Sequence, residues 1–282
     1  MSGTDHFITL EGHRFHYVRW SVPGAPVLVA LHGLRSYGRT FEPLAEALAG
    51  RFDVVALDQR GRGLTDWDPQ GNYYTDRYVA DLAAFVDALG LDRFHLLGHS
   101  MGGTNTLVYA AGNADRLASV VLEDAGPGAS TNSERGKAIN AELMRTPMRF
   151  DNRDAARAFW RSIRPHVTEE AIDSRVRHSL EEGEGGFVWR HDQAGIAAAR
   201  LDPAPGRGVP DLWPGVKAIR CPGLLVRGGD SDYLSPATAA AMVAANANLQ
   251  RVDIPGAGHY VHDDQPAAFL AAVVPFLAEQ AR

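Results

Sequence analysis

The stretch Gly98-His99-Ser100-Met101-Gly102-Gly103 lies where one sequence pattern gives way to another. Before it, Phe94–Leu97 is a short apolar run, typical of a strand that is covered on both faces. After it, residues 101–111 have the spacing of a helix. Glycines on both sides of Ser100 let neighbouring backbones come close, because a side chain there would clash. We therefore predict a tight strand-to-helix turn that presents the Ser100 hydroxyl above a sheet.

Short apolar runs and helical segments alternate on both sides of this turn. Strands are expected at residues 7–10, 14–20, 27–31, 54–57, 94–97, 119–122, 224–226 and 249–254. Helices are expected at residues 41–48, 78–89, 101–111, 236–245 and 266–278. This alternation predicts an α/β fold, with a mostly parallel eight-stranded sheet and helices on both faces.

The alternation is interrupted between residues 126 and 214. This stretch has helical patches and many charges but no obvious buried strand. We predict a mainly helical cap, or lid, that is inserted after the sixth strand. The core domain is then expected to comprise residues 1–125 and 215–282, and the cap residues 126–214.

Composition narrows the class of protein. The chain has 282 residues, 45% of them hydrophobic, and a formal net charge of −6. An acidic balance argues against a nucleic-acid partner, because phosphate contacts need positive charge. Neither a signal peptide nor an apolar run of about 20 residues is apparent, so a cytoplasmic protein without a membrane partner is expected. Its single cysteine, Cys221, is interpreted as a packed thiol, and the oligomeric state is left open between monomer and homodimer.

Ser100 fits the G-x-S-x-G pattern of a serine nucleophile. A serine hydroxyl is a poor nucleophile until a base takes its proton. His259, in the glycine-rich stretch 256–260 after the last predicted strand, is placed to be that base. His262 is an alternative base, and His99 is expected to pack beside the site and contribute to substrate binding.

The turn after the third predicted strand completes this arrangement. His32-Gly33 stands there, and Gly33 permits a tight turn. The backbone N–H groups of Leu34 and Met101 would then form an oxyanion hole. His32 is expected to shape the turn, with general base as its alternative role.

The acid that orients the histidine is ambiguous. Asp232 lies in the loop 229–236 after the seventh strand, and Asp124 follows the sixth. Both strand ends are expected at the same edge of the sheet as Ser100, and the histidine needs only one carboxylate. Asp232 is our first choice and Asp124 the alternative, with Asp230 or Glu123 less favoured.

Taken together, these segments resemble the α/β-hydrolase family over nearly the whole chain outside the cap. They occur in family order: His32-Gly33, then Asp58-Gln59-Arg60-Gly61-Arg62-Gly63-Leu64-Thr65, the Ser100 turn, the loop 229–236, and Gly258-His259. The resemblance implies Ser100 as nucleophile, His259 as base, and Leu34 and Met101 as oxyanion donors. The usual acid position matches Asp232, but some branches place the acid where Asp124 stands. The segment 58–65 is implied to be a structural loop.

The predicted cap carries a series of arginines. Arg145, Arg149, Arg153, Arg157 and Arg161 are spaced four apart, and Arg164 follows. Residues four apart share one face of a helix, although Pro147 interrupts it and Asn152 is a candidate cap for a helix from residue 153. We take Arg145 and Arg149, with the apolar Trp160, as candidate substrate-binding residues, the arginines binding a substrate carboxylate. The alternative is a solvated face paired with nearby acids.

These residues predict a serine hydrolase that cleaves a small or medium ester, amide or lactone through an acyl-enzyme. Alternatives are a hydrolase of carbon–carbon bonds, a cofactor-free lyase or oxygenase, and a ligand receptor on the same scaffold. The histidines lack metal-ligand spacing, and no phosphate-binding or dinucleotide motif is apparent. No metal and no cofactor are therefore expected, and the expected partner is a small-molecule substrate.

Overall fold

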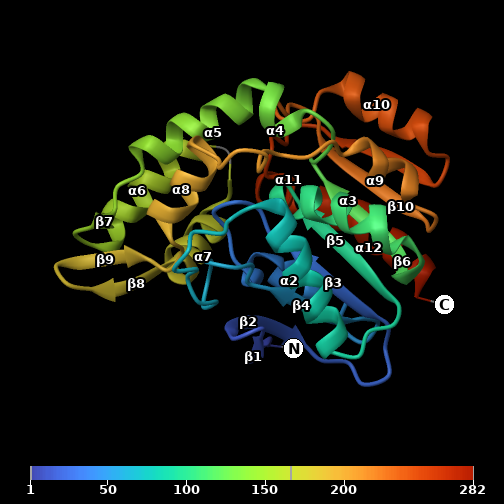
Figure 1. The fold of residues 1–282 in the computed structure, drawn as a ribbon, viewed down its shortest axis with the longest axis horizontal. Coiled ribbons are helices and arrows are strands. Elements are labelled where there is room, and N and C mark those ends of the chain that lie inside the picture. The colour runs from blue at the N-terminus through green and yellow to red at the C-terminus, as the bar shows by residue number, and fades with distance from the viewer. Residues whose placement is uncertain (1, 166, 282) are drawn as a thin grey trace.

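An eight-stranded sheet forms the centre of the molecule (Figure 1), for which the computed structural model describes residues 2–165 and 167–281. Its strands, in spatial order, are β1 (Thr4–Leu10), β2 (His13–Trp20), β4 (Asp53–Leu57), β3 (Val27–Leu31), β5 (Phe94–His99), β6 (Leu117–Glu123), β10 (Gly223–Gly228) and β11 (Leu249–Ile254). From β4 to β11 all neighbouring strands are parallel, whereas β1 and β2 pair antiparallel. The predicted mostly parallel sheet is confirmed.

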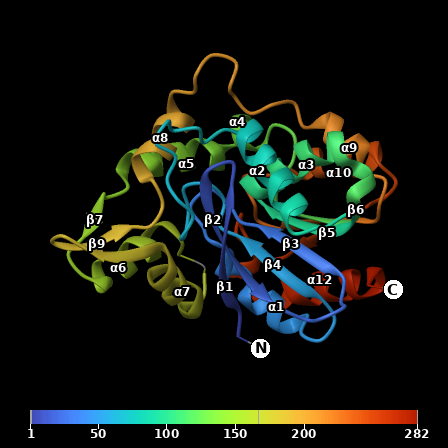
Figure 2. The ribbon, with the colours of Figure 1, turned by 60° about the horizontal axis from the view of Figure 1, so that its bottom comes forward.

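Helices cover both faces of this sheet (Figure 2). On one face lie α1 (Glu42–Ala47) and α12 (Pro266–Gln280). On the other lie α2 (Thr75–Ala88), α3 (Met101–Asn113), α9 (Trp213–Ala218) and α10 (Pro236–Ala245). The central strands are buried on both faces, which is why their sequences are continuous apolar runs. Two short 3-10 helices, η1 (Gly38–Phe41) and η2 (Ala114–Arg116), and the short α11 (Val261–Asp264) lie in the connections.

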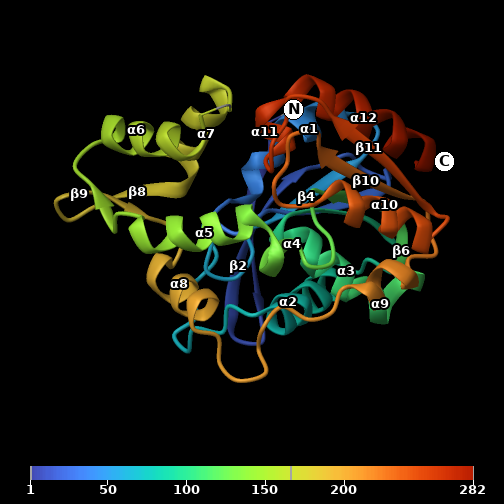
Figure 3. The ribbon, with the colours of Figure 1, turned by 90° about the horizontal axis from the view of Figure 1, so that it is seen from above.

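Between β6 and β10 the chain leaves the sheet and forms a separate layer (Figures 1 and 3). It contains α4 (Ala129–Asn132), α5 (Glu134–Arg145), α6 (Arg153–Ile163), α7 (Glu169–Ser179) and α8 (Gln193–Leu201). A small antiparallel sheet of β7 (Arg149–Phe150), β9 (Gly186–Trp189) and β8 (Leu180–Gly183) accompanies them. Trp160 lies at the centre of an apolar cluster that belongs to this layer. The layer is mainly helical, as expected, but its small sheet is not predicted.

The end of this layer differs from the expected boundary at residue 214. That position falls inside α9, and Leu212 and Val216 pack in the apolar core under the main sheet. The chain has therefore returned to the core by residue 212. We call residues 126–211 the cap segment.

Two further expectations concern the chain as a whole. Cys221 is buried in the core, and burial raises the pKa of its thiol to about 11, as suits a packed residue. Within the described ranges, no helix combines the length and the apolar character that a membrane span needs.

Candidate active site

Ser100 stands on the predicted tight turn between β5 and α3. Its backbone has φ 54° and ψ −113°, a conformation that residues with a Cβ rarely adopt. Its N–H donates to the Glu123 carbonyl at 3.0 Å, and its carbonyl accepts from Thr104 N at 2.9 Å. A Cβ on Gly102 would collide with the Leu31 carbonyl. The glycine therefore lets the start of α3 approach β3, which holds Ser100 at the carboxyl end of the sheet.

A chain of hydrogen bonds joins three buried side chains at this turn. Ser100 Oγ donates to His259 Nε2 at 2.8 Å, and His259 Nδ1 donates to Asp124 Oδ2 at 2.7 Å. The exposed fractions of Ser100, His259 and Asp124 are 5%, 3% and 0%. An imidazole held in this way can accept the serine proton while the carboxylate stabilises its charged form.

The carboxylate beside His259 belongs to Asp124 and not to Asp232, so our first choice of acid is wrong. Asp232 and Asp230 are both exposed. Glu123 is buried but pairs with His262. Asp124 directly follows β6 and turns its side chain toward the histidine with φ 45°. The loop that carries Asp232 instead turns its carboxylate to solvent.

The loop after β10 still supports the site, through residues that sequence reasoning missed. Ser231 Oγ donates to Asp124 Oδ2 at 2.6 Å, and Gly228 N donates to Oδ1 at 3.3 Å. Arg227 holds this loop by donating to the carbonyls of Leu234 and Ser231. The Tyr233 ring packs against the His259 ring with centroids 4.0 Å apart and the two planes tilted by 36°. Ser231 and Tyr233 stand beside Asp232 in the sequence. The loop 229–236 therefore does belong to the site, but it contributes Ser231 and Tyr233 and not the acid.

Burial and neighbouring charges determine the protonation states of His259 and Asp124. Burial lowers the pKa of His259 well below 6.5, and the positive charges of Arg135 and Arg164 lower it further. Burial raises the pKa of Asp124, whereas donors from Ser231 and Gly228 favour its ionised form. At neutral pH His259 is therefore uncharged and able to act as a base.

His262 and His99 lie behind His259. His262 Nδ1 pairs with Glu123 Oε1 at 2.7 Å, and its Nε2 lies 3.0 Å from Thr40 Oγ1. The Glu123 charge raises the pKa of His262 to about 9 against the opposing effect of burial. His99 Nε2 donates to the His259 carbonyl at 3.0 Å, and burial lowers the pKa of His99 to about 3.

Neither ring is placed to take a proton from Ser100. His99, Glu123 and His262 each have one potential metal-ligand atom, and these three atoms lie within 4.8 Å of one another. Both ring nitrogens of His262 already have partners in the protein, Glu123 and Thr40. We therefore interpret the cluster as an ion pair between His262 and Glu123, with an uncharged His99 beside it.

The two expected oxyanion donors flank Ser100. Met101 is the first residue of α3, so its N–H has no acceptor inside the helix. Leu34 lies on the turn after β3 and lines the same hollow as Ser100. Arg62 fastens this turn, because its Nε donates to the Leu34 carbonyl at 3.1 Å. His32 accepts from Gln59 N at 3.1 Å, and burial lowers its pKa to about 4, which fits its expected role in shaping the turn.

Two hollows meet at Ser100, Leu34 and Ile139. The smaller one has a volume of about 20 Å³. The larger one has a volume of about 310 Å³. The smaller hollow is lined by Arg35, Arg164, Arg175 and Tyr260, besides residues of the Ser100 and Leu34 turns.

Positive charge is in excess around the smaller hollow. Arg35 pairs with Glu142 at 2.5 Å, and Arg135 binds the other oxygen of that carboxylate at 2.6 Å. Arg175 pairs with Asp263. Arg164 comes no closer than 4.0 Å to a carboxylate of the described residues, and its Nε and Nη1 lack a partner there. Four guanidinium groups thus face two carboxylates.

These are not the arginines that we expected. Arg145 and Arg149 are exposed and line neither hollow. Arg157 and Arg161 pair with Glu169 on the surface of the cap segment, as the alternative interpretation holds. Trp160 is fully buried in the cap cluster. Its ring lies 5.2 to 5.8 Å from the guanidinium carbons of Arg35, Arg164 and Arg175, so it supports the three arginines without lining a hollow.

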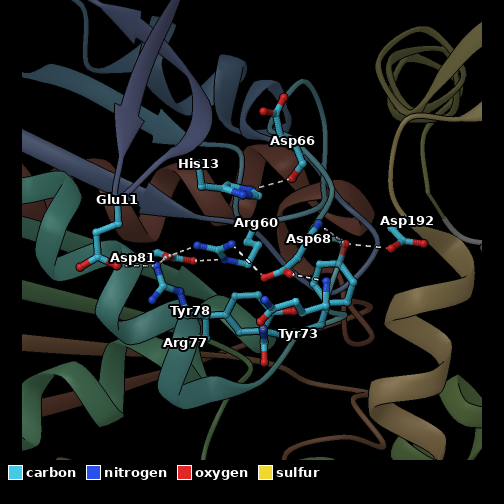
Figure 4. Close-up of polar contacts among 12 residues, drawn as sticks. Glu11, His13, Arg60, Asp66, Asp68, Tyr73, Arg77, Tyr78, Asp81 and Asp192 are labelled. Carbon is cyan, nitrogen blue, oxygen red and sulfur yellow. Dashed lines mark hydrogen bonds and ion pairs between the residues drawn. The ribbon is translucent and has the colours of Figure 1, made fainter.

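A polar network holds the wall of the larger hollow against the core (Figure 4). The Arg60 guanidinium lies between Asp68 and Asp81, at 2.9 Å and 2.7 Å. Tyr73, which lines the larger hollow, donates to Asp192 of the cap segment at 2.8 Å. The segment 58–65 therefore has a structural role, as the resemblance implies, and its Gly61 carbonyl also accepts from Asp192 N of the cap segment at 3.0 Å.

Comparison with known proteins agrees with this geometry. The model of the alpha/beta hydrolase family matches residues 28–273. The chain belongs to that family. This hydrolase is 32% identical to 2-(acetamidomethylene)succinate hydrolase of Mesorhizobium japonicum, over 97% of its own chain and 96% of the relative. It is 31% identical to N-formylmaleamate deformylase of Pseudomonas putida, over 96% and 95%.

A solved structure extends the likeness to three dimensions. The crystal structure of E-2-(acetamidomethylene)succinate hydrolase superposes with a TM-score of 0.87 at 28% sequence identity, covering 98% of this hydrolase and 99% of that chain. Esterase YbfF of Escherichia coli is 29% identical over 89% of this chain and 92% of the relative. Hydrolysis is the activity that these relatives share.

Proposed function

We propose that this hydrolase cleaves an ester, amide or lactone through an acyl-enzyme on Ser100. The observation that carries the proposal is the continuous hydrogen-bonded chain from Asp124 through His259 to the strained Ser100. Each part has one role in acyl transfer. Ser100 attacks the carbonyl carbon, His259 takes the proton, and Asp124 holds the imidazole in the required tautomer.

The remaining steps follow from the same groups. Backbone N–H groups of Leu34 and Met101 stabilise the oxyanion, each such donor contributing roughly 10²–10³ in rate. His259 passes its proton to the leaving alcohol or amine, and the carbonyl–leaving-group bond breaks. Water, deprotonated by His259, then attacks the acyl-enzyme and releases the acid.

We further propose that the substrate carries a carboxylate close to the scissile carbonyl. The smaller hollow beside Ser100 has room for one small group, and three buried arginines face it. Burial lowers the pKa of Arg164 to about 9, so the guanidinium is still charged at neutral pH. The carboxylate nearest to Arg164 among the described residues, Glu142 at 4.0 Å, is already bound by Arg35 and Arg135, so a bound substrate carboxylate would lower the cost of burying the Arg164 charge. Arginine suits this role because its planar fork matches a carboxylate.

The names of two relatives support the same substrate class. 2-(Acetamidomethylene)succinate and N-formylmaleamate each combine at least one carboxylate with an amide. The Arg164 and Arg175 positions in the cap segment, together with Arg35 in the core, give this chain a structural reason to select such substrates.

Three small esters test the carboxylate preference. Monoethyl succinate carries the charge on the acyl side, acetoxyacetate carries it on the alcohol side, and ethyl valerate is uncharged. We expect kcat/KM for the better charged ester to exceed that for ethyl valerate by about 10²-fold, consistent with about 1.5–3 kcal/mol for a charge-assisted contact. Acid release at constant pH measures the rates.

Arg164→Gln provides the variant for this test. It should reduce kcat/KM for the charged ester by about 10- to 100-fold and leave ethyl valerate within about threefold of wild type. Arg145→Gln, at an exposed arginine of the same cap segment, is the matched control and should behave as wild type. Equal rates on charged and uncharged esters in wild type would overturn the carboxylate proposal.

A further inference from the structure

The larger hollow is the part of this site that the reaction steps do not explain. It shares Ser100, Leu34 and Ile139 with the smaller hollow and otherwise has a lining of its own. At about 310 Å³ it has the size of a small-ligand pocket, whereas the smaller hollow holds one small group. The site is therefore asymmetric about Ser100, and so is the substrate that fits it.

The wall of the larger hollow combines aromatic and aliphatic side chains. Tyr73, Tyr74 and Tyr78 come from the core, and Ile196 and Ala199 from α8 of the cap segment. Such surfaces bind ring-bearing or branched carbon groups, because they remove apolar area from water. Water alone would be a poor occupant of this part of the hollow.

The charged residues in this lining are all cations. They are Arg62, Lys137, Arg200 and Arg207, and no Asp or Glu is among the described residues of the lining. Arg62 is fully buried and is saturated by the Leu34 and Arg60 carbonyls and the Tyr78 hydroxyl. Lys137 pairs with Glu134, and Arg207 pairs with Asp76.

Arg200 has no paired carboxylate in the described part of the chain, unlike Lys137 and Arg207, and it is only partly buried, whereas Arg62 is fully buried. The Arg200 Nε donates to Asn140 Oδ1 at 2.8 Å, and its other two nitrogens reach the Ser130 hydroxyl and carbonyl at 3.2 Å and 3.4 Å. These partners are neutral. Across the described residues, no carboxylate lies within 4.0 Å of its guanidinium, so Arg200 is held in place with its charge uncompensated. Asn140 and Ser130 line the hollow with it.

We propose that the larger hollow binds the bulkier half of the substrate, a ring-bearing or branched group that ends in an anionic group against Arg200. The substrate then carries negative charge on both sides of the scissile bond, one charge at Arg164 and the other at Arg200. This inference rests on the proposed hydrolase function. It specifies the size and the charge of the substrate half that would occupy the larger hollow.

Binding to the Ser100→Ala variant tests this proposal without turnover. The probes are 4-(4-carboxyphenyl)butanoate and 4-(4-methylphenyl)butanoate, which share one carboxylate on a short chain and carry either a second carboxylate or an uncharged methyl group on the ring. Titration calorimetry should show the dianion binding about 10- to 100-fold tighter, the range expected for one charge-assisted contact. Adding Arg200→Gln should cut this ratio to below about threefold, whereas adding Arg145→Gln should leave it unchanged.

The outcomes separate this proposal from the one on which it rests. If both probes bind equally, or if neither binds, the second anionic position is overturned. Labelling of wild-type Ser100 by a fluorophosphonate reports the activated serine independently, so a labelled enzyme that fails the binding test refutes the inference alone. A ratio that survives Arg200→Gln would also contradict it, because another residue would then carry the recognition.

Discussion

Backbone strain is concentrated at the two ends of the hydrogen-bonded chain. Among the described residues, those other than glycine with positive φ are Glu11, Ser100 and Asp124. Glu11 lies in the turn between β1 and β2, where such geometry is common. Each strained position costs on the order of 1–3 kcal/mol and persists only where its surroundings fix it. Strain at Ser100 and at Asp124 therefore supports a functional role for both.

The protonation of His259 makes a prediction about pH. Burial and the nearby arginine charges place its pKa well below 6.5, and the base form is the uncharged one. Activity should therefore be retained at pH 6.5 and fall only at lower pH, as the imidazole gains a proton. The measurement is kcat/KM for an uncharged ester such as ethyl valerate between pH 4 and 8. An acid limb with its midpoint above about 7 would contradict the proposed environment of His259.

Single residues of the site were predictable to different degrees. Ser100 and His259, which the structure joins by a hydrogen bond, were predicted from sequence because glycine-rich turns at the ends of β5 and β11 leave few other positions for a nucleophile and a base. The acid was not, because Asp124 and Asp232 follow neighbouring parallel strands, β6 and β10, and end at the same edge of the sheet. Only the direction of each side chain separates them, and that direction depends on the φ of Asp124.

At the scale of elements, α3 depends on close packing at its first turn. Gly102→Ala would place a methyl group against the Leu31 carbonyl, whereas a Cβ on the exposed Gly112, in the last turn of the same helix, would meet nothing within 4 Å. We expect Gly102→Ala to lower the free energy of unfolding by a few kcal/mol, since an overpacked position costs about 1–3 kcal/mol.

Gly112→Ala is the matched control for this change. It should raise the free energy of unfolding by about 0.5–1 kcal/mol, because alanine is the better helix former. Urea denaturation followed by circular dichroism measures both variants. Equal stability of the two variants would show that the contact between α3 and β3 is not as tight as described.

The elements of the core follow from the sequence more closely than those of the cap segment. The central strands β3, β4 and β5 are buried along nearly their whole length, so each leaves a mainly apolar run. β7, β8 and β9 are only two to four residues long and partly exposed, so they leave no such signal.

The arginines of the cap segment were misjudged for a related reason. A helix with a four-residue spacing would have aligned Arg145 and Arg149, but α5 ends at Arg145 and Arg149 lies in β7. The arginines that reach the site come from three separate places. Arg35 follows β3, Arg164 follows α6, and Arg175 lies in α7. No spacing in the sequence connects them, since the fold alone brings them together.

At the scale of the whole molecule, polar contacts fasten the cap segment to the core around the site. Arg35 in the core pairs with Glu142, and Tyr37 donates to Ser174 at 2.9 Å. Asp263, four residues after His259, pairs with Arg175 of the cap segment. Because Arg35 and Arg175 also line the smaller hollow, the proposed carboxylate recognition and the attachment of the cap segment would use the same side chains.

The buried pair of His262 and Glu123 makes global stability depend on pH. The folded pKa of His262 is raised to about 9, above its ordinary value of 6.5. Its stabilising effect is therefore fully present below about pH 6.5 and is lost as pH rises through about 9. At about 1.4 kcal/mol per pKa unit the loss is on the order of 3 kcal/mol.

Two measurements check this dependence. NMR titration of the His262 ring should give a pKa near 9, and urea denaturation should show a fall in the free energy of unfolding between pH 7 and 10. His262→Gln should be less stable than wild type at pH 6, and the difference should shrink by pH 10. A ring that titrates at or below 6.5 would show that the ion pair is absent.

The central claim is that Asp124 and His259 activate Ser100 for acyl transfer, and covalent labelling tests it most directly. Wild type, Asp124→Asn and Asp232→Asn are each treated with a fluorophosphonate, and the adduct is located by intact mass and peptide mapping. The account predicts one adduct on Ser100, formed at the wild-type rate in Asp232→Asn and at least about 10²-fold more slowly in Asp124→Asn, because only Asp124 holds the imidazole. Folded wild-type protein without an adduct on Ser100, or equal slowing in the two variants, would contradict it.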